Sequence, residues 1–228
     1  MERWNSRTFQ YFDNAEKKKQ NKEWFLKNQS LYLAHVRQPF ETLIAALAKK
    51  LGPYLAPEIV FTPTRITRPL RVGDRAKARG AVKNHSHATF WEKPTSRFEW
   101  NPGIHIQIGA REDDNFVGLG LYEPSSRQMK LLRHHLVEDF DTIHGLLTKK
   151  KIQDRWGGIQ GPRFVRFPKD YRGHESNPYL WNKQFFLGQN FSRKEVCSRG
   201  FVDQVCEDLA LALPFFSWVR GAVGKYRR

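Results

Sequence analysis

The sequence predicts an α+β fold with a mainly antiparallel sheet. Residues 21–51 and 192–209 carry apolar side chains at helical spacing, so helices are expected near both ends of the chain. Residues 58–122 change to a period of two, which is typical of strands joined by short turns. A single long helical segment, 125–149, follows them. We therefore expect an N-terminal helical region, one central helix and a C-terminal helix around an antiparallel sheet.

The N-terminal region is expected to hold a short helix and then a longer one. The short helix falls in FQYFDNAEKKKQ (9–20), which ends in a charged turn. In 21–51 an apolar stripe recurs at spacings of three, four or seven, and its members are Phe25, Tyr32, Val36, Phe40, Leu43 and Leu47. Pro39 removes an intrahelical donor and clashes with the preceding turn, so a kink or a break is expected there. Gly52-Pro53 closes the region.

Five strands are predicted after this region. They are IVFTPTRIT (59–67), HATFWE (87–92), GIHIQIGA (103–110), FVGLGLY (116–122) and KQFFLGQNF (183–191). The turn-rich pieces NPG and REDDN separate the middle strands, which favours antiparallel pairing.

Two further helices are predicted in the second half of the chain. The central one, 125–149, has its apolar positions at Met129, Leu132, Leu136, Phe140, Ile143 and Leu147. Ser125 or Ser126 is the expected N-cap. An irregular Gly/Pro stretch, 157–178, follows. Ser192 and Glu195 fit the S-x-x-E capping box of the C-terminal helix.

Composition limits the class of protein. The 228 residues include no apolar run near the roughly 18 that a membrane span requires, and the N-terminus lacks the apolar stretch of a signal peptide. We therefore expect a cytoplasmic protein with no membrane partner, in which Cys197 and Cys206 stay reduced. No repeat or linker divides the chain, so residues 1–228 are expected to form a single domain.

The net charge of +16, from 39 basic and 23 acidic residues, indicates an anionic partner. Nucleic acid or a small phosphate-bearing molecule is expected. The alternative is that the charge serves only solubility. Because net charge does not locate the site, the distribution of the basic residues has to be considered.

The hairpin GIHIQIGAREDDNFVGLGLY places apolar and polar side chains on opposite faces. Ile104, Ile106 and Ile108 share one face, and His105, Gln107 and Gly109 share the other. On the partner strand Gly118 and Gly120 lie opposite the apolar positions. Repeated glycine in a strand often marks a close approach, so this face is expected to form the floor of a cleft. The alternatives are an ordinary solvated face or a helix packed tightly over the glycines.

The common catalytic and metal-binding motifs are absent from the sequence. His85 and His87 would share a strand face, and His134 and His135 lie in the central helix, but no H-E-x-x-H or C-x-x-C spacing accompanies them. Phosphate loops, G-x-S-x-G elbows and dinucleotide fingerprints are also missing. We therefore expect no metal and no cofactor.

The stretch TRITRPLRVGDRAKARGAVKNH (64–85) carries seven Arg or Lys and one Asp. Arg65, Arg68 and Arg71 recur at an interval of three. In an extended chain Arg65 and Arg71 would point one way and Arg68 the other, whereas a turn near Pro69 would bring all three around one anion. The alternative is a solvated basic loop.

The order of several motifs along the chain resembles the domain-of-unknown-function family 2461. NKEWFLKNQSLY resembles the family's N-x-x-W-F-x-x-N helix, RITRPLR its R-I-x-R-D-x-R-F signature, and FPKDY its P-K-G-Y run. The resemblance implies a similar fold and a basic cluster, which would consist of Arg65, Arg68, Arg71, Lys83, Arg133, Lys169 and Lys183. The chain departs from the family pattern at Pro69, where Asp is typical, and over 72–82.

Three functions are compatible with these features. The first is binding of an anionic, phosphate-bearing ligand or nucleic acid in a basic cleft. In this hypothesis Arg65, Arg68, Arg71 and Lys83 clamp the anion, His85, His105 and Gln107 line the floor, and Arg133, Lys169 and Lys183 add charge from other elements. The second is an enzyme that acts on a phosphate ester with His85 or His105 as acid or base. The third is a basic module that docks an acidic protein.

Overall fold

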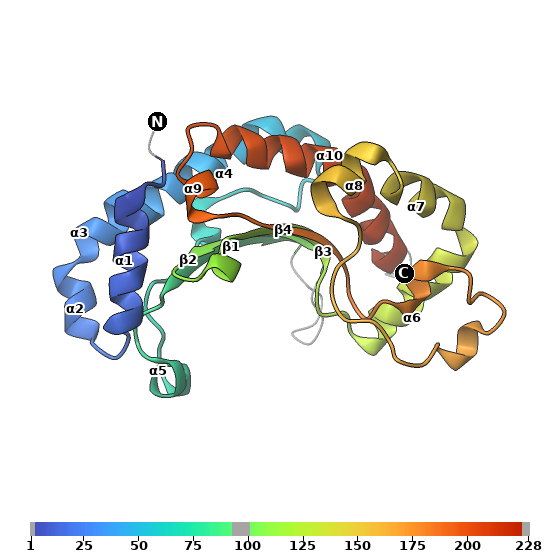
Figure 1. Ribbon diagram of the computed structural model, residues 1–228, viewed down its shortest axis with the longest axis horizontal. Helices are drawn as coiled ribbons and strands as arrows, with labels where there is room; N and C mark the ends of the chain where they lie inside the picture. The colour runs from blue at the N-terminus through green and yellow to red at the C-terminus, as the bar shows by residue number, and fades with distance from the viewer. Residues whose placement is uncertain (1–2, 93–100, 225–228) are drawn as a thin grey trace. The chain divides into compact units, whose positions relative to one another are not determined.

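A computed structural model describes residues 3–92 and 101–224 of the chain (Figure 1). The predicted α+β class is confirmed. Four strands, β1 (His85–Trp91), β2 (Gly103–Gly109), β3 (Phe116–Leu121) and β4 (Phe185–Asn190), form one antiparallel sheet in the order β1-β2-β3-β4. These strands match four of the five predicted segments.

The chain divides into two compact units. Unit 1 comprises Met1–Phe90, His105–Val117 and Asn190–Cys206. Unit 2 comprises Trp91–Ile104, Gly118–Gln189 and Glu207–Arg228. The expectation of one domain over residues 1–228 stays a prediction.

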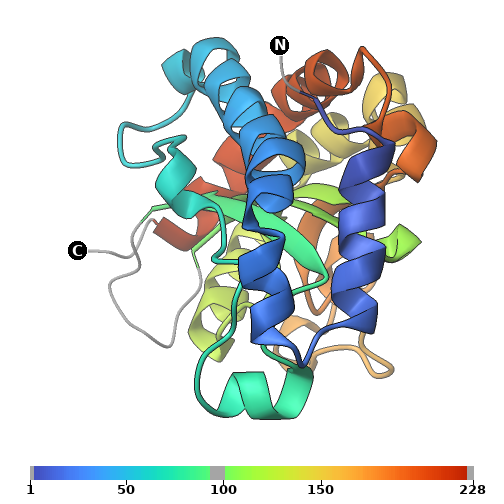
Figure 2. The same cartoon turned by 90° about the vertical axis from the view of Figure 1, so that its left-hand side faces the viewer.

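The N-terminal helices of unit 1 follow the sequence pattern. Helix α1 (Ser6–Lys17) begins at Asn5, whose side chain accepts a hydrogen bond from the main-chain N–H of Arg7. The predicted longer helix is a succession of α2 (Lys22–Lys27), α3 (Gln29–Tyr32), the π-helical turn η1 (Leu33–Arg37) and α4 (Gln38–Lys50). Figure 2 shows α1 beside this succession, and the Tyr11 and Tyr32 rings lie 5.8 Å apart between them.

The irregularity expected at Pro39 takes the form of the π-helical turn just before it. Pro39 occupies the first turn of α4, where its missing N–H is tolerated. In η1 the Gln38 N–H bonds to the Leu33 carbonyl, five residues back. The apolar stripe is nevertheless continuous, because all six of its members are buried, with Phe25 the most accessible at 5 %.

The predicted strand at 59–67 is wrong. Pro63–Arg65 is instead a 3₁₀ turn, η3, in which the Thr62 hydroxyl accepts from the Thr64 N–H. Proline and a capping threonine favour this turn over a ladder. Short contacts remain after it, since Ile66 bridges Ala88 and Leu70 bridges Val82, both antiparallel. The short helix α5 (Asp74–Arg79) lies in the loop between Leu70 and Val82.

The central helix of unit 2 is divided in two. Helix α6 (Ser126–Glu138) begins at Ser125, as predicted, with a reciprocal capping box to Gln128. Asp139 then leaves the helical conformation, with φ −129° and ψ 39°, and α7 (Phe140–Leu147) follows. Helix α8 (Lys150–Trp156) and the 3₁₀ turns η5 (Lys169–Tyr171) and η6 (Pro178–Trp181) complete the region before β4.

The C-terminal helix begins later than its capping signal. The Ser192–Glu195 capping box is present, but it starts the one-turn helix α9 (Arg193–Val196). The long helix α10 (Phe201–Gly224) follows after a break. Of the helices that the structure describes, none is both long and apolar enough to cross a membrane.

Candidate functional site

The predicted alternation is confirmed along β2, and His85 and His87 share a face of β1 as expected. Strand β3, the other strand of the predicted hairpin, shows no alternation of burial, because residues 117–121 are all buried. Ile106 and Ile108 are fully buried on one face. The other face is half-buried and carries His85, His87, Thr89, His105 and Gln107, which we call the polar face.

Three imidazoles of the polar face form a row. The rings of His85 and His87 are stacked at 5.9 Å, and those of His87 and His105 lie 5.2 Å apart. His105 Nδ1 is 2.7 Å from the Thr89 hydroxyl across the two strands. His85 Nδ1 lies 3.0 Å from the Asn84 side-chain oxygen. Neighbouring strands therefore fix the positions of the rings.

The environment keeps these imidazoles neutral. Burial is the largest cause, and it lowers the pKa of His85 to about 4, of His87 to about 3 and of His105 to about 4. Positive charge acts in the same direction, because Arg71, Lys83 and Arg111 all disfavour protonation of His85. At neutral pH the row offers uncharged donors and acceptors.

Lys83 adds a partly buried cation beside His85. Burial, Arg71 and Arg75 all lower the pKa of the Lys83 ammonium. In the part of the chain that the structure describes, Lys83 forms no ion pair. The positive charge around Lys83 is therefore poorly compensated.

Arg71 makes main-chain contacts that were not expected. Its Nη1 donates to the main-chain carbonyls of Arg79, Gly80 and Val82, at 3.3, 3.1 and 2.9 Å. Its own N–H bonds to the Ala81 carbonyl at 2.7 Å. Arg71 thus holds together the two ends of the loop that contains α5. This use of the guanidinium could not be read from the three-residue interval.

Arg65 and Arg68 are the other two arginines that recur at an interval of three. Arg65 is half-buried at the end of η3, and Arg68 is exposed. Their grouping with Arg71 around one anion stays a prediction.

Close packing fills the space above two glycines of the strands. A Cβ on Gly109 would lie 2.6 Å from His85 Cβ and 2.7 Å from Asp114 Cβ. A Cβ on Gly120, whose φ is +130°, would lie 2.5 Å from the Phe185 carbonyl oxygen. At these two positions the chain itself packs closely over the glycine, but the packed groups come from β1, β4 and the turn before β3 and not from a helix.

A carboxylate stands at the end of the polar face. Gln107 Nε2 donates to Asp114 Oδ1 at 3.2 Å, and the Arg111 N–H donates to Asp114 Oδ2 at 3.1 Å. Burial raises the pKa of Asp114. The position of Arg111 near His85 was not predicted, because it depends on the turn between β2 and β3.

The remaining predicted site residues belong to unit 2. Arg133 of α6 lies over the Phe164 ring, with Cζ 4.6 Å from its centroid, and Lys183 Nζ is 5.2 Å from the same centroid. Lys169 is exposed in η5. Residues from distant parts of the sequence thus meet on one aromatic ring that sequence reasoning left unassigned.

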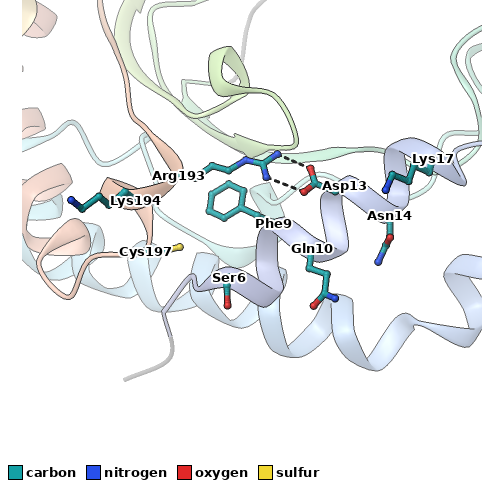
Figure 3. Close-up of a pocket in the computed structure, with 9 residues that line it drawn as sticks. All are labelled: Ser6, Phe9, Gln10, Asp13, Asn14, Lys17, Arg193, Lys194 and Cys197. Carbon is teal, nitrogen blue, oxygen red and sulfur yellow. Dashed lines mark hydrogen bonds and ion pairs between the residues drawn. The ribbon is translucent and has the colours of Figure 1, made fainter.

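A shallow surface depression of about 580 Å³ lies between α1 and α9 in unit 1 (Figure 3). The Arg193 guanidinium forms a bidentate pair with Asp13 at 2.9 and 2.6 Å and also contacts the Ala110 carbonyl. Burial raises the pKa of the nearby Cys197 thiol, so the thiol is a poor nucleophile. Because its main cation is already paired, this depression is a weaker candidate than the polar face.

Metal-binding geometry is not found in residues 3–92 and 101–224, since no group of three His, Cys, Asp or Glu side chains converges there. The neutral imidazoles of the polar face thus lie beside two cations, of which Lys83 has no ion pair among the described residues and Arg111 pairs with Glu16 at 4.0 Å.

The chain belongs to the family described as conserved hypothetical proteins, DUF2461, whose model matches residues 7–218. This match confirms the resemblance seen in the sequence. Comparison with curated proteins and with solved structures gives no match.

Proposed function

We propose that this DUF2461 protein binds a phosphate-bearing or other anionic ligand at the polar face of unit 1. The observation that carries the proposal is the unbalanced charge of Lys83. A partly buried ammonium whose nearest charged neighbours are arginines is stabilised by an added anion.

The histidines of the polar face and the cations beside it have separate roles in this proposal. Lys83 supplies the charge, and Arg111 adds a second cation near His85. The neutral imidazoles of His85 and His105 donate or accept hydrogen bonds without bringing a counter-charge. Arg71 is a positioning residue, because its contacts hold the chain between Pro69 and Lys83.

A small anion is favoured over nucleic acid as the specific ligand. The half-buried row of histidines suits a compact group, whereas a duplex requires an extended set of phosphate contacts. The net charge of +16 still supports weak, salt-dependent binding of nucleic acid. For this nucleic-acid binding we expect affinity to fall steeply with salt, with a slope of log K against log salt of about −0.9 per phosphate contact.

The enzyme alternative has less support from the same geometry. An imidazole with a pKa of about 4, as for His85 and His105, is a weak base at neutral pH. Hydrolysis of a phosphate ester that disappears in His85→Gln with ligand affinity retained would favour this alternative. Capture of an acidic peptide instead of a phosphate would favour the interaction module.

Titration calorimetry with inorganic phosphate at constant ionic strength tests the proposal. Lys83→Met is expected to weaken phosphate binding by about tenfold or more, because it removes a charge-assisted hydrogen bond. Lys151→Met, at an exposed position on α8, is the matched control and should bind phosphate normally. Equal affinities of the two variants would contradict the proposal. Unfolding curves without phosphate show whether the effect of Lys83→Met is only a loss of stability.

A further inference from the structure

Arg133 is held between aromatic side chains in unit 2. Its guanidinium carbon lies 4.6 Å from the Phe164 ring centroid and 6.0 Å from that of Tyr171. Lys183 approaches the same Phe164 ring with its Nζ at 5.2 Å. Two cations thus share one ring, which stabilises each of them through the ring quadrupole but does not neutralise either.

The main chain holds this arrangement in place. The Phe164 N–H donates to the Trp181 carbonyl at 2.7 Å, and the Lys183 N–H donates to the Pro162 carbonyl at 2.9 Å. These bonds place the two residues side by side on paired segments. The Tyr171 hydroxyl donates to the Lys130 carbonyl at 3.2 Å and so ties η5 to α6. Hydrogen bonds to the main chain therefore hold the Phe164 and Tyr171 segments in place around Arg133.

The polar edge of Arg133 is buried, and it has no hydrogen-bond acceptor among residues 3–92 and 101–224. The two atoms are Nε and Nη2, which lie on one side of the guanidinium and which we call the Arg133 fork. This is the edge that binds a carboxylate or phosphate through two parallel N–H···O bonds. Buried donors without acceptors are costly and uncommon in native proteins.

Arg155, another arginine of unit 2, has the same Nε and Nη2 edge paired with a carboxylate. Arg155 donates from Nε and Nη2 to the two carboxylate oxygens of Asp208, both at 2.5 Å. Arg133 has no such partner among the residues that the structure describes. Asp170 favours the charged form of Arg133 through space but forms no ion pair with it, and Asp170 itself is exposed.

We propose that the Arg133 fork is a second oxyanion site, which binds a carboxylate or phosphate group of a ligand against Phe164 and Tyr171, with Lys183 as a second positive charge. The site lies in unit 2 and uses none of the residues of the polar face, so it goes beyond the function proposed above. The Arg133 guanidinium supplies the two parallel N–H donors, which the Lys183 ammonium cannot supply because it has no planar fork.

Entry of the anion requires the covering side chains to move. The fork atoms are shielded from solvent, and Phe164 lies in a stretch without regular secondary structure between α8 and η5. Val165, the next residue, is 93 % exposed, so the outer side of this stretch is free to shift. Binding is therefore expected to be slower than a diffusion-controlled encounter.

Nitrogen-15 NMR of the arginine side chains tests the site directly. A buried Nε–H exchanges slowly with water, and its signal can be assigned by its loss in Arg133→Lys. Titration with sodium acetate or with inorganic phosphate, each at constant ionic strength, is expected to move the Arg133 Nε–H signal to a saturating value. A shift with acetate alone identifies a carboxylate site, and a shift with phosphate alone identifies a phosphate site. Absence of a shift with both anions overturns the proposal, because the fork is then satisfied by water.

Substitutions separate the fork from its charge. Arg133→Lys keeps the charge and is expected to weaken binding of the active anion by about tenfold. Arg172→Lys, an exposed arginine next to η5, is the matched control with unchanged affinity. Unchanged affinity of Arg133→Lys overturns the proposal, even if Arg133→Met fails to fold. Lys83→Met should leave the Arg133 signal and its titration intact, so failure of this site and failure of the polar face are distinguishable.

Discussion

The Thr8 hydroxyl donates a hydrogen bond of 2.7 Å to the main-chain carbonyl of His35. Pro39 stands four residues after His35 and has no N–H, so it cannot serve as the α-helical donor to that carbonyl. Fully buried Thr8 of α1 supplies a donor that the proline removes from the neighbouring helix. The contact between the two helices and the break in helical bonding thus have one cause.

Thr8→Val tests this relationship. The variant keeps the shape of the side chain but leaves the part-buried His35 carbonyl without its donor, and it also removes the acceptor of the Asn5 N–H. These losses should cost about 1–3 kcal/mol of unfolding free energy. In a Pro39→Ala background the alanine N–H can take over, and the cost of Thr8→Val should fall. Urea unfolding of the four proteins measures the coupling. Equal costs in the two backgrounds would separate Thr8 from Pro39.

Two glycines should respond to alanine in opposite directions. Gly120→Ala places a Cβ 2.5 Å from the Phe185 carbonyl oxygen at a φ of +130°. We expect a loss of about 1–3 kcal/mol from overpacking and further loss from the backbone conformation. Gly145→Ala, in α7 with open space around it, should stabilise the protein by about 0.5–1 kcal/mol. Thermal unfolding decides, and a mild effect of Gly120→Ala would contradict the close packing of β3 and β4.

Acid should destabilise the fold through the histidine row. The pKa of His87 falls from 6.5 in the unfolded chain to about 3 in the fold, so the unfolded chain binds the extra proton between these values. Stability is therefore full above about pH 6.5 and declines as the pH falls towards about 3. His87→Phe removes this titration, so its unfolding free energy should decline less than that of the unchanged protein between pH 7.5 and pH 5. Parallel declines would show that His87 is not responsible.

Local signals in the sequence were sufficient for most of the fold. The apolar stripe of 21–51 and the alternation around Ile106 depend on near neighbours, and the structure confirms both. The central helix divides at Asp139, whose carboxylate accepts from the Thr142 hydroxyl at 2.6 Å and from Trp218 Nε1 at 2.8 Å. The second of these donors is distant in the sequence. The early stop after the Ser192 capping box falls on the turn 197–200, which ends in Gly200, a residue typical of helix ends.

The candidate site was less accessible to sequence reasoning. Strand alternation correctly placed His105 and Gln107 on the polar face. The partners of Arg71, however, are carbonyls of a turn eight to eleven residues away, and carbonyl positions carry no side-chain signature. Phe164 was hidden for a similar reason, since its contacts with Arg133 and Lys183 depend on how an irregular stretch folds back.

Two arginines of the stretch 64–85 should respond differently to substitution. Arg71→Ala removes the donors to the Arg79, Gly80 and Val82 carbonyls, and it should lower the unfolding free energy by about 1–2 kcal/mol without any ligand, since net hydrogen-bond energies are modest at a half-exposed site. Arg71→Lys should recover little, because one ammonium cannot reproduce the guanidinium geometry. Arg68→Ala, at an exposed position, should change stability by less than about 0.5 kcal/mol.

Phosphate affinity, measured on the folded fraction of the same variants, then assigns the roles. If Arg68 belongs to the anion site, Arg68→Ala weakens phosphate binding while its unfolding curve stays unchanged. If Arg68 is only a solvated charge, both measurements stay unchanged, and the clamp of three arginines is excluded. A large loss of stability in Arg68→Ala would show instead that it is paired inside the fold, because an exposed side chain without buried contacts cannot produce such a loss.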